Sequence, residues 1–172
     1  MSPRQIPLKY FHALYDSPCG VLHLMATDSA LCALAFESNW PVVWQRFAAG
    51  SSSVIDAENK IIAQTRIQLA EYFLGQRKSF DVPLKITGTA FQKQVWDALQ
   101  QIPYGTVWNY TQQAEWLDRP KALRAVGSAN GKNPIGILVP CHRVISKSGE
   151  LGGYSGGLLI KKQLLQLEQN FS

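Results

Sequence analysis

Tight turns divide the first 36 residues into three strand-like runs, and this pattern constrains the fold more than any other feature of the chain. The runs cover residues 9–15, 21–26 and 31–36, and apolar side chains dominate each of them. The connecting segments, residues 16–20 and 27–29, consist mainly of Asp, Ser, Thr, Pro and Gly, which favour turns. Connections this short join antiparallel strands, so the sequence predicts an antiparallel meander.

A helical pattern follows the strands and completes a small α+β unit. We expect this helix from about Ala57, with Gly75 as its C-cap. Its buried face carries Ile62, Thr65, Leu69, Tyr72 and Phe73. Residues 80–88 include Pro and Gly and read as a connector. The sequence therefore predicts an N-terminal α+β domain over residues 1–86 and a second domain over residues 87–172.

Helix-capping residues mark the first helix of the second domain. Thr89 and Gln92 have the N-cap and N3 spacing of a capping box. Pro103 ends the helix, because proline cannot continue one. The buried stripe of this helix consists of Phe91, Val95, Leu99 and Ile102.

Two shorter helices are expected next. Asn109 and Gln112 again have N-cap and N3 spacing, for a helix that runs through Leu117. A turn at residues 118–119 leads to Pro120, which suits the first position of a second helix that reaches about residue 130. This pattern predicts a helix-turn-helix, although many helical domains contain that geometry without touching DNA.

The second of these helices has an unusually bare face. Ala122, Ala125 and either Ser128 or Ala129 recur at a spacing of three to four residues, so that face can approach another surface closely. Helix packing inside the protein is the alternative use of such a face. The expected fold is thus α/β of the α+β type, with an N-terminal antiparallel sheet plus helix and a mostly helical, winged-helix-like C-terminal domain.

Charge is unevenly distributed between the two halves. The net charge is +5. Residues 1–86 contain eight Lys and Arg against seven Asp and Glu, whereas residues 87–172 contain nine against five. The basic second half favours a polyanionic partner, and a solvated basic face is the alternative.

Cysteine usage and hydropathy indicate the compartment. Cys19, Cys32 and Cys141 make an odd number with no paired spacing, which argues against a disulfide framework. No apolar run is long enough to span a membrane, and the first residues lack the apolar core of a secretory signal. We expect reduced thiols, no membrane association and a cytoplasmic protein, nucleoid-associated if bacterial.

One segment combines a thiol with an imidazole. The run from Val139 to Val144 reads VPCHRV and places Cys141 beside His142 within apolar sequence. A neighbouring base can raise the thiolate fraction of a cysteine, which makes Cys141 a candidate nucleophile. A buried, inert thiol next to an unrelated histidine is the alternative, because free cysteine is often buried.

Further motifs in the same half resemble one family. The VPCHRV segment and these motifs, in this order, resemble the O6-alkylguanine-DNA alkyltransferases over about half of the chain. The first eighty or so residues resemble the family only loosely, through Asp16, Ser17, Pro18 and Gly20. The additional motifs are IPYGTV at 102–107, Tyr110, RAVG at 124–127, Asn133 with Pro134, GYSGG at 153–157, and Leu164, Leu165 and Glu168.

The resemblance implies direct repair of DNA. The protein would flip O6-alkylguanine, and also O4-alkylthymine, out of the duplex and transfer the alkyl group irreversibly to Cys141. His142 would take the thiol proton through a bridging water, and Glu168 would hold the imidazole tautomer. Adjacent side chains on an extended strand point apart, so Cys141 and His142 are not expected to touch directly. Asn133 would brace the helix-turn-helix against the active-site segment.

The resemblance also assigns residues to the DNA and to the pocket. Arg124 would replace the extruded base and Tyr110 would help to rotate the target nucleotide. The carbonyls of Cys141 and Val144 would accept from the guanine amino group. The helix face that enters the minor groove would consist of the small residues Ala122, Ala125, Gly127 and Ser128. The wall of the substrate pocket would consist of Tyr154, Ser155 and Gly156.

We expect no cofactor and no metal. Relatives can carry zinc in the N-terminal region, but Cys19, Cys32, His12 and His23 lack recognisable ligand spacing here. The expected partner is double-stranded DNA bound by a monomer, with cooperative binding left open. The alternatives are a damage binder that lacks catalysis, a thiol hydrolase and a transcription regulator. Cys141 argues against the first, and the predicted helix-turn-helix against the second.

Overall fold

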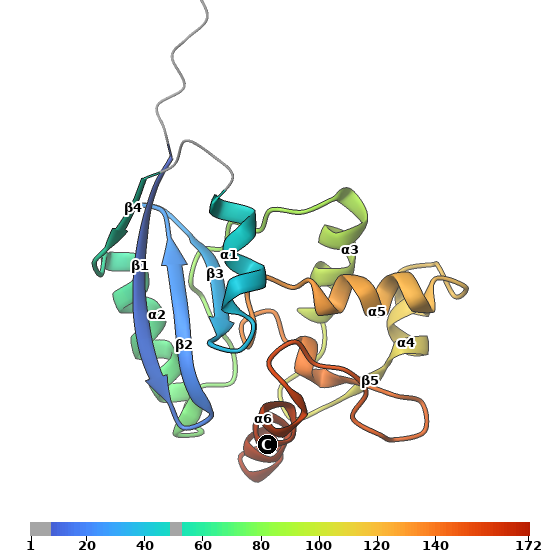
Figure 1. Ribbon diagram of the computed structural model, residues 1–172. Helices are drawn as coiled ribbons and strands as arrows, with labels where there is room; N and C mark the ends of the chain where they lie inside the picture. Colours follow the sequence, from blue (N-terminus) through green and yellow to red (C-terminus); the bar gives the residue numbers. More distant parts are fainter. Residues whose placement is uncertain (1–7, 49–52) are drawn as a thin grey trace, which may run out of the picture.

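The computed structural model of the chain describes residues 8–48 and 53–172 (Figure 1). The predicted meander is confirmed, with β1 pairing antiparallel to β2 and β2 to β3. A helix, α1, and a fourth strand, β4, follow it, and β4 pairs parallel to β1. The sheet order is β3-β2-β1-β4. The bounds are β1 Lys9–Ser17, β2 Gly20–Ala26, β3 Leu31–Phe36, α1 Trp40–Ala48 and β4 Ser53–Asp56.

The sheet is therefore mixed and not purely antiparallel as the sequence predicts. β4 has four residues, of which only Val54 is half-buried and the others are exposed. This strand has no alternating burial pattern, because three of its four side chains are exposed and neither face is fully covered. Its parallel pairing depends on β1, which lies more than forty residues earlier in the chain.

The helix α2 extends over Lys60–Phe73, three residues later than its predicted start. Its N-cap is Asn59, whose Oδ1 accepts from the backbone N–H of Ile62 at 3.0 Å. At the other end, Leu74 is the C-cap and Gly75 follows it with a φ of 72°. Glycine adopts this left-handed conformation without strain, so Gly75 ends the helix as its position suggests.

The two faces of the sheet have different partners. α1 covers one face, where Met25, Ala33 and Val43 are buried together. α2 covers the other face, where Leu24 and Leu34 contribute to a core that continues into the second half of the chain (Figure 1). One continuous core thus joins the N-terminal sheet to the C-terminal helices.

Helices dominate the second half. Both capping spacings are confirmed as reciprocal capping boxes, at Thr89 with Gln92 and at Asn109 with Gln112. The first helix ends at Leu99, so Ile102 is buried in the turn beyond it. The bounds are α3 Ala90–Leu99, β5 Trp108–Asn109, α4 Tyr110–Trp116, α5 Leu123–Gly131, a 3-10 turn at Cys141–Arg143, β6 Val144–Ile145 and α6 Leu158–Asn170.

The two short helices of the predicted helix-turn-helix are present as α4 and α5. The predicted start of α5 at Pro120 is wrong: the helix begins at Leu123, after the N-cap Ala122. Asp118 takes a φ of 59°, and the N–H of Ala122 bonds to the carbonyl of Arg119, so Pro120 lies inside a turn. The small sheet of this half is a parallel pair, β5 with β6, and the winged-helix detail stays a prediction.

A buried pair of amides fixes α4 against α5. Gln113 Nε2 donates to Asn130 Oδ1 at 3.0 Å, and Asn130 Nδ2 donates to Gln113 Oε1 at 2.7 Å. The indole N–H of Trp96 on α3 donates to the carbonyl of Ala129 at 2.9 Å. Because buried polar groups need partners, these bonds hold the three helices in one arrangement.

The two halves of the chain meet along the free edge of β3. Leu31 exchanges backbone hydrogen bonds with the connector at Pro83 and Lys85, each of 2.8 Å. Leu34 donates to the carbonyl of Pro134 and accepts from Gly136. The edge of the sheet is therefore covered by chain, and the segment after α5 is tied to the N-terminal sheet. Within the described ranges, no helix is long and apolar enough to span a membrane.

Candidate active site

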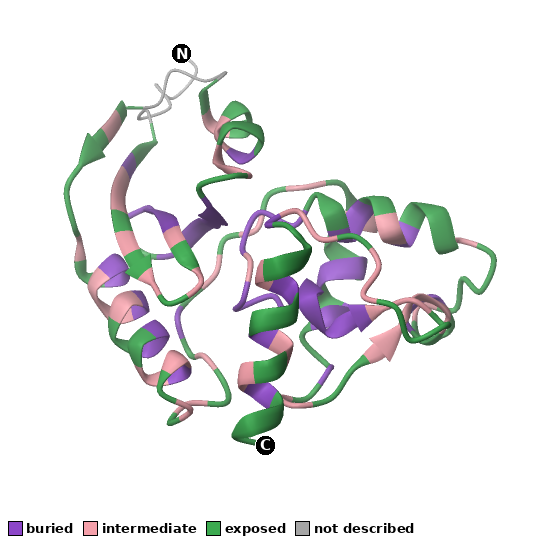
Figure 2. Cartoon of the chain, turned by 60° about the horizontal axis from the view of Figure 1, so that its bottom comes forward, coloured by how far each residue is buried: buried purple, intermediate pink, exposed green. Residues whose placement is uncertain are grey.

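The segment that carries the cysteine is the most continuously buried part of the second half. Residues 133–144 are all buried except Gly136, which is half-buried (Figure 2). Ile137 has a φ of 65°, which a β-branched residue rarely adopts, and the surrounding packing holds it there. Cys141 lies on a 3-10 turn and not on the strand that the sequence suggests.

Asn133 fixes the cysteine from one side. Its Nδ2 donates to the carbonyl of Val139 at 2.7 Å and to Cys141 Sγ at 3.3 Å. Its Oδ1 accepts from the N–H of Ile135 at 3.0 Å. One buried amide thus joins the residues after α5 to the thiol.

His142 is completely buried and bonds to one carboxylate. Its Nε2 lies 2.7 Å from Glu168 Oε1, whereas Nδ1 has no partner among the described residues. Burial lowers the pKa of His142 and outweighs the opposing effect of Glu168. A neutral ring with its proton on Nε2 satisfies this geometry and leaves Nδ1 as an acceptor.

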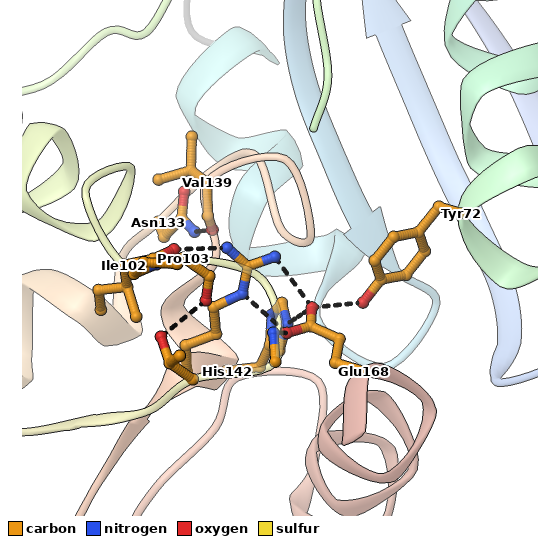
Figure 3. Close-up of polar contacts among 10 residues, drawn as sticks. Tyr72, Ile102, Pro103, Asn133, Val139, His142 and Glu168 are labelled. Atoms are coloured by element: carbon orange, nitrogen blue, oxygen red, sulfur yellow. Dashed lines mark hydrogen bonds and ion pairs between the residues drawn. The ribbon is translucent and has the colours of Figure 1, made fainter. Parts of the chain in front are cut away.

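Glu168, on α6, accepts hydrogen bonds from four residues (Figure 3). Arg143 donates through Nε to Oε2 at 2.9 Å and through Nη2 to Oε1 at 3.0 Å. Tyr72 donates to Oε1 at 2.8 Å and the N–H of Gly105 to Oε2 at 3.2 Å. Burial alone would raise the pKa of Glu168, but the hydrogen bond from His142 and the hydrogen bonds and charge of Arg143 lower it to about 2.

The sequence analysis assigns no role in the site to three residues of this region. Arg143 and Lys161 are buried cations, and Tyr72 reaches the site from α2 in the N-terminal half. Arg143 stands within the cysteine motif, and a basic residue in an apolar segment is a signal that it has a buried partner. No local pattern indicates the contacts of Lys161 or Tyr72, because their partners lie in other elements.

Lys161 holds the loop before α6. Its Nζ donates to the carbonyls of Val144 at 2.6 Å, of Leu151, and of Gly153 at 3.0 Å. Burial lowers the pKa of Lys161 to about 8. The carbonyl of Val144, expected to accept from guanine, is therefore already bonded to Lys161, and that of Cys141 accepts from the N–H of Val144.

The thiol itself is not ionised in advance. Burial raises the pKa of Cys141, and the opposing effects of the Asn133 hydrogen bond and the Lys161 charge are smaller. No hydrogen bond joins Cys141 to the ring of His142 within the described residues. At neutral pH the resting group is a thiol, so a base must remove its proton during the reaction.

A pocket of about 170 Å³ opens beside the thiol. Of the residues that the resemblance assigns to the pocket, Tyr154 and Ser155 line this cavity, whereas Val144 and Gly156 do not. A Cβ on Gly156 would lie 2.8 Å from the Tyr154 ring and 2.9 Å from Phe36, so the glycine permits close packing against β3. The complete lining is Tyr110, Gly127, Asn130, Gly131, Cys141, Gly153, Tyr154 and Ser155.

The face of α5 beside this pocket is accessible. Arg124, Ala125 and Ser128 are exposed, and Ala122 and Gly127 are half-buried. Ala129 is buried against α3 and does not belong to the exposed face. The small-residue face therefore consists of Ala125 and Ser128, with Gly127 turned towards the pocket.

A second cluster of histidines and carboxylates lies on the N-terminal sheet. His12 Nδ1 bonds to Asp56 at 2.9 Å, and His12 Nε2 lies 2.9 Å from His23 Nδ1. His23 Nε2 lies 2.5 Å from Glu37, and Trp40 stacks on both imidazoles. Among the residues that the structure describes, no group of three His, Cys, Asp or Glu side chains is arranged to hold a metal ion.

Comparison with known proteins gives consistent results over most of the chain. Models described as the DNA binding domain and the ribonuclease-like domain of 6-O-methylguanine DNA methyltransferase match residues 90–170 and 10–86. The methylated-DNA–protein-cysteine methyltransferase of Methanosarcina acetivorans is 43% identical over 92% of this chain and 97% of its own. That of Mycobacterium bovis is 53% identical over 90% of each. The crystal structure of Mycobacterium tuberculosis OGT in complex with DNA superposes with a TM-score of 0.83 at 40% identity, covering 94% of each chain.

Proposed function

Because the chain belongs to the methylated-DNA–protein-cysteine methyltransferase family, we propose that it repairs O6-alkylguanine in DNA by moving the alkyl group onto its own Cys141. The activity is that of a methylated-DNA–protein-cysteine S-methyltransferase. The observation that carries the assignment to Cys141 is its position: the thiol lines a small pocket beside an exposed helix face and next to a buried histidine–glutamate pair.

Proton removal from the thiol uses the free nitrogen of His142. A water molecule between Cys141 Sγ and His142 Nδ1 would pass the proton to the ring, and Glu168 would stabilise the imidazolium that forms. The thiolate then attacks the alkyl carbon, so that an S–C bond forms as the C–O6 bond breaks. The leaving guanine takes up a proton and keeps its oxygen. The product is a thioether, which has no good leaving group, so each molecule reacts once.

Access to O6 requires that the nucleotide leaves the base stack, because a thiol in a pocket cannot reach a stacked base. Arg124 is exposed on α5 and would occupy the space that the base leaves. Tyr110 lines the pocket and would guide the target nucleotide into it. Ala125 and Ser128 permit close approach to the minor groove. The same pocket would admit O4-alkylthymine.

The remaining features of the proposal follow from this substrate. The relative that superposes on this chain was solved in complex with DNA, which supports DNA as the partner. Two domains, residues 1–86 and 87–172, agree with the ranges of the two family models. We expect a monomer, which would act in the cytoplasm or nucleoid where the DNA lies. We expect neither metal nor cofactor.

The mass of the intact protein after incubation with O6-methylguanine duplex tests the transfer. The expected result is one added methyl group on the peptide that contains Cys141, and a burst of repair equal to the protein concentration. Cys141→Ser should bind the duplex and repair nothing. Repair over many turnovers, or methyl on Cys19 or Cys32, would contradict the assignment. A thiol hydrolase would leave the protein mass unchanged.

Arg124→Ala tests base flipping. Repair of duplex DNA should fall about tenfold or more, whereas reaction with free O6-benzylguanine should not change, because a free base needs no extrusion. Lys121→Ala, which removes a nearby exposed charge, is the matched control. Equal losses on both substrates would mean that Arg124 supports the pocket and not the flipped state.

A further inference from the structure

A tyrosine of the N-terminal half enters the polar network of the active site. Tyr72 is completely buried on α2, and its hydroxyl donates to Glu168 Oε1 at 2.8 Å. The two residues lie 96 positions apart in the sequence, and Figure 3 shows the contact between their side chains. Burial and the neighbouring Glu168 charge raise the pKa of Tyr72 well above its ordinary value, so the hydroxyl keeps its proton. The N-terminal half thus supplies a neutral hydrogen-bond donor to the carboxylate that binds His142.

Tyr72 shares one oxygen atom with His142. Glu168 Oε1 accepts from His142 Nε2 at 2.7 Å, from Tyr72 at 2.8 Å and from Arg143 Nη2 at 3.0 Å. Each donor satisfies part of the negative charge on that oxygen and leaves less of it to stabilise a proton on His142. Tyr72 therefore affects both the position of the carboxylate and the basicity of the imidazole.

A second tyrosine in the same place makes no such bond. Tyr104 packs edge-on against Tyr72 with ring centroids 6.0 Å apart, and Arg143 lies 5.7 Å above its ring. Its hydroxyl is buried without a partner among the described residues. The two hydroxyls share one environment, but only that of Tyr72 bonds to Glu168.

We propose that Tyr72 is a positioning residue for the alkyl transfer, through which the N-terminal domain sets the orientation of Glu168 and the proton affinity of His142. The inference rests on the proposed function. Without the Tyr72 hydroxyl, Oε1 has more negative charge to offer, so the protonated form of His142 becomes more stable. His142 then remains protonated up to a higher pH. Below that pH it accepts the thiol proton less readily.

Tyr72→Phe tests this directly, because it removes only the hydroxyl and keeps the ring. Transfer should slow by about tenfold near neutral pH, and equally on duplex DNA and on free O6-benzylguanine. The rising limb of the pH–rate profile should move to higher pH. The loss of transfer rate should therefore become smaller as the pH increases from about 6 to about 9. Tyr104→Phe is the matched control and should keep the rate and the profile of the unmodified protein.

Two further measurements separate positioning from folding. A titration of the His142 ring nitrogens by NMR should give a higher pKa in Tyr72→Phe than in Tyr104→Phe, and it needs no activity. In a double-mutant cycle with Glu168→Gln, the Tyr72→Phe effect on the rate should largely disappear, because Tyr72 acts through that carboxylate. Additive effects, with an unmoved His142 titration, would overturn the proposal.

The outcomes also distinguish this inference from the proposed function. Failure of the unmodified protein to alkylate Cys141 would remove the proposed function. Alkylation at the same rate and with the same pH profile in both proteins would remove only the role of Tyr72. A loss in Tyr72→Phe that is equal at every pH and persists in the Glu168→Gln background would assign Tyr72 to the stability of the domain contact alone and overturn the proposal.

Discussion

Two histidine–carboxylate networks occupy the two halves of this protein and differ mainly in burial. The side chains of His142 and Glu168 are 0% and 1% exposed. Those of Asp56 and Glu37, the carboxylates beside the N-terminal histidines, are 89% and 71% exposed. The contact distances are similar, at 2.7 Å for the buried pair and 2.9 and 2.5 Å for the exposed pairs. Contact distance therefore does not distinguish the buried network from the surface one.

Burial changes what surrounds each carboxylate. The chain from Asp56 through His12 and His23 to Glu37 contains three contacts, and the carboxylates at both of its ends are exposed to water. In the buried network, Arg143 and Tyr72 complete the partners of Glu168 without solvent. The Nδ1 atom of His142 has no partner among the described residues, so it is available for the proposed proton transfer.

The largest expected difference between the networks is in the rate of alkyl transfer. Glu168→Gln should slow transfer by about 10²–10⁴, because His142 loses the partner that fixes its tautomer and stabilises its charged form. Glu37→Gln, the matching change in the surface network, should leave the rate unchanged. The rate of Cys141 alkylation, followed by intact mass, checks both. A large loss in Glu37→Gln would remove the functional distinction between the two networks.

The next effect concerns stability. Arg143→Met should lower the free energy of unfolding by about 3–5 kcal/mol, because Glu168 would lose its main buried counter-charge. Arg66→Met removes the exposed partner of Glu58 and should cost less than about 1 kcal/mol. Urea unfolding at neutral pH measures both. Equal losses would show that burial does not set the strength of these ion pairs.

Acid should destabilise the protein through the buried network. The pKa of Glu168 falls from 4.5 to about 2 on folding, so its contribution is present above pH 4.5 and is lost as the pH falls towards 2. The lowered pKa of His142 acts in the same direction, because the unfolded chain takes up its proton first as the pH falls below 6.5. The Glu168 contribution is on the order of 3 kcal/mol.

Unfolding free energies measured from neutral pH downwards check this slope. Glu168→Gln should flatten the part of the curve below pH 4.5, where the carboxylate titrates in the unfolded chain. An unchanged curve in Glu168→Gln would show that other carboxylates cause the acid loss.

The smallest effect is expected at the surface network itself. Asp56→Asn should lower the free energy of unfolding by less than about 1 kcal/mol, because the carboxylate is exposed and its attraction to His12 is screened by solvent. Repair activity should not change. A loss of several kcal/mol would mean that the Asp56 contact holds β4 to the sheet more strongly than its exposure suggests.

Local signals in the sequence were sufficient where a structure depends on residues within one turn or one hairpin. The capping boxes at Thr89 and Asn109 and the turns of the meander are of this kind. The predicted start of α5 at Pro120 fails because the left-handed conformation of Asp118 places the proline inside a turn. α1 contains an apolar spacing at Trp40, Val43 and Phe47, which could have revealed it.

The sequence by itself determined the three strands of the meander, the capped helices and the motif that sets Cys141 beside His142, since each depends on neighbouring residues. The tertiary structure alone decided the ionisation of these groups. The pKa of the Cys141 thiol is raised by burial, and Glu168 stays ionised because Arg143 and His142 surround it. It also decided that Tyr72, from the other half of the chain, shares the same carboxylate oxygen. These properties depend on solvent exclusion and on contacts between distant segments, and no local pattern encodes either.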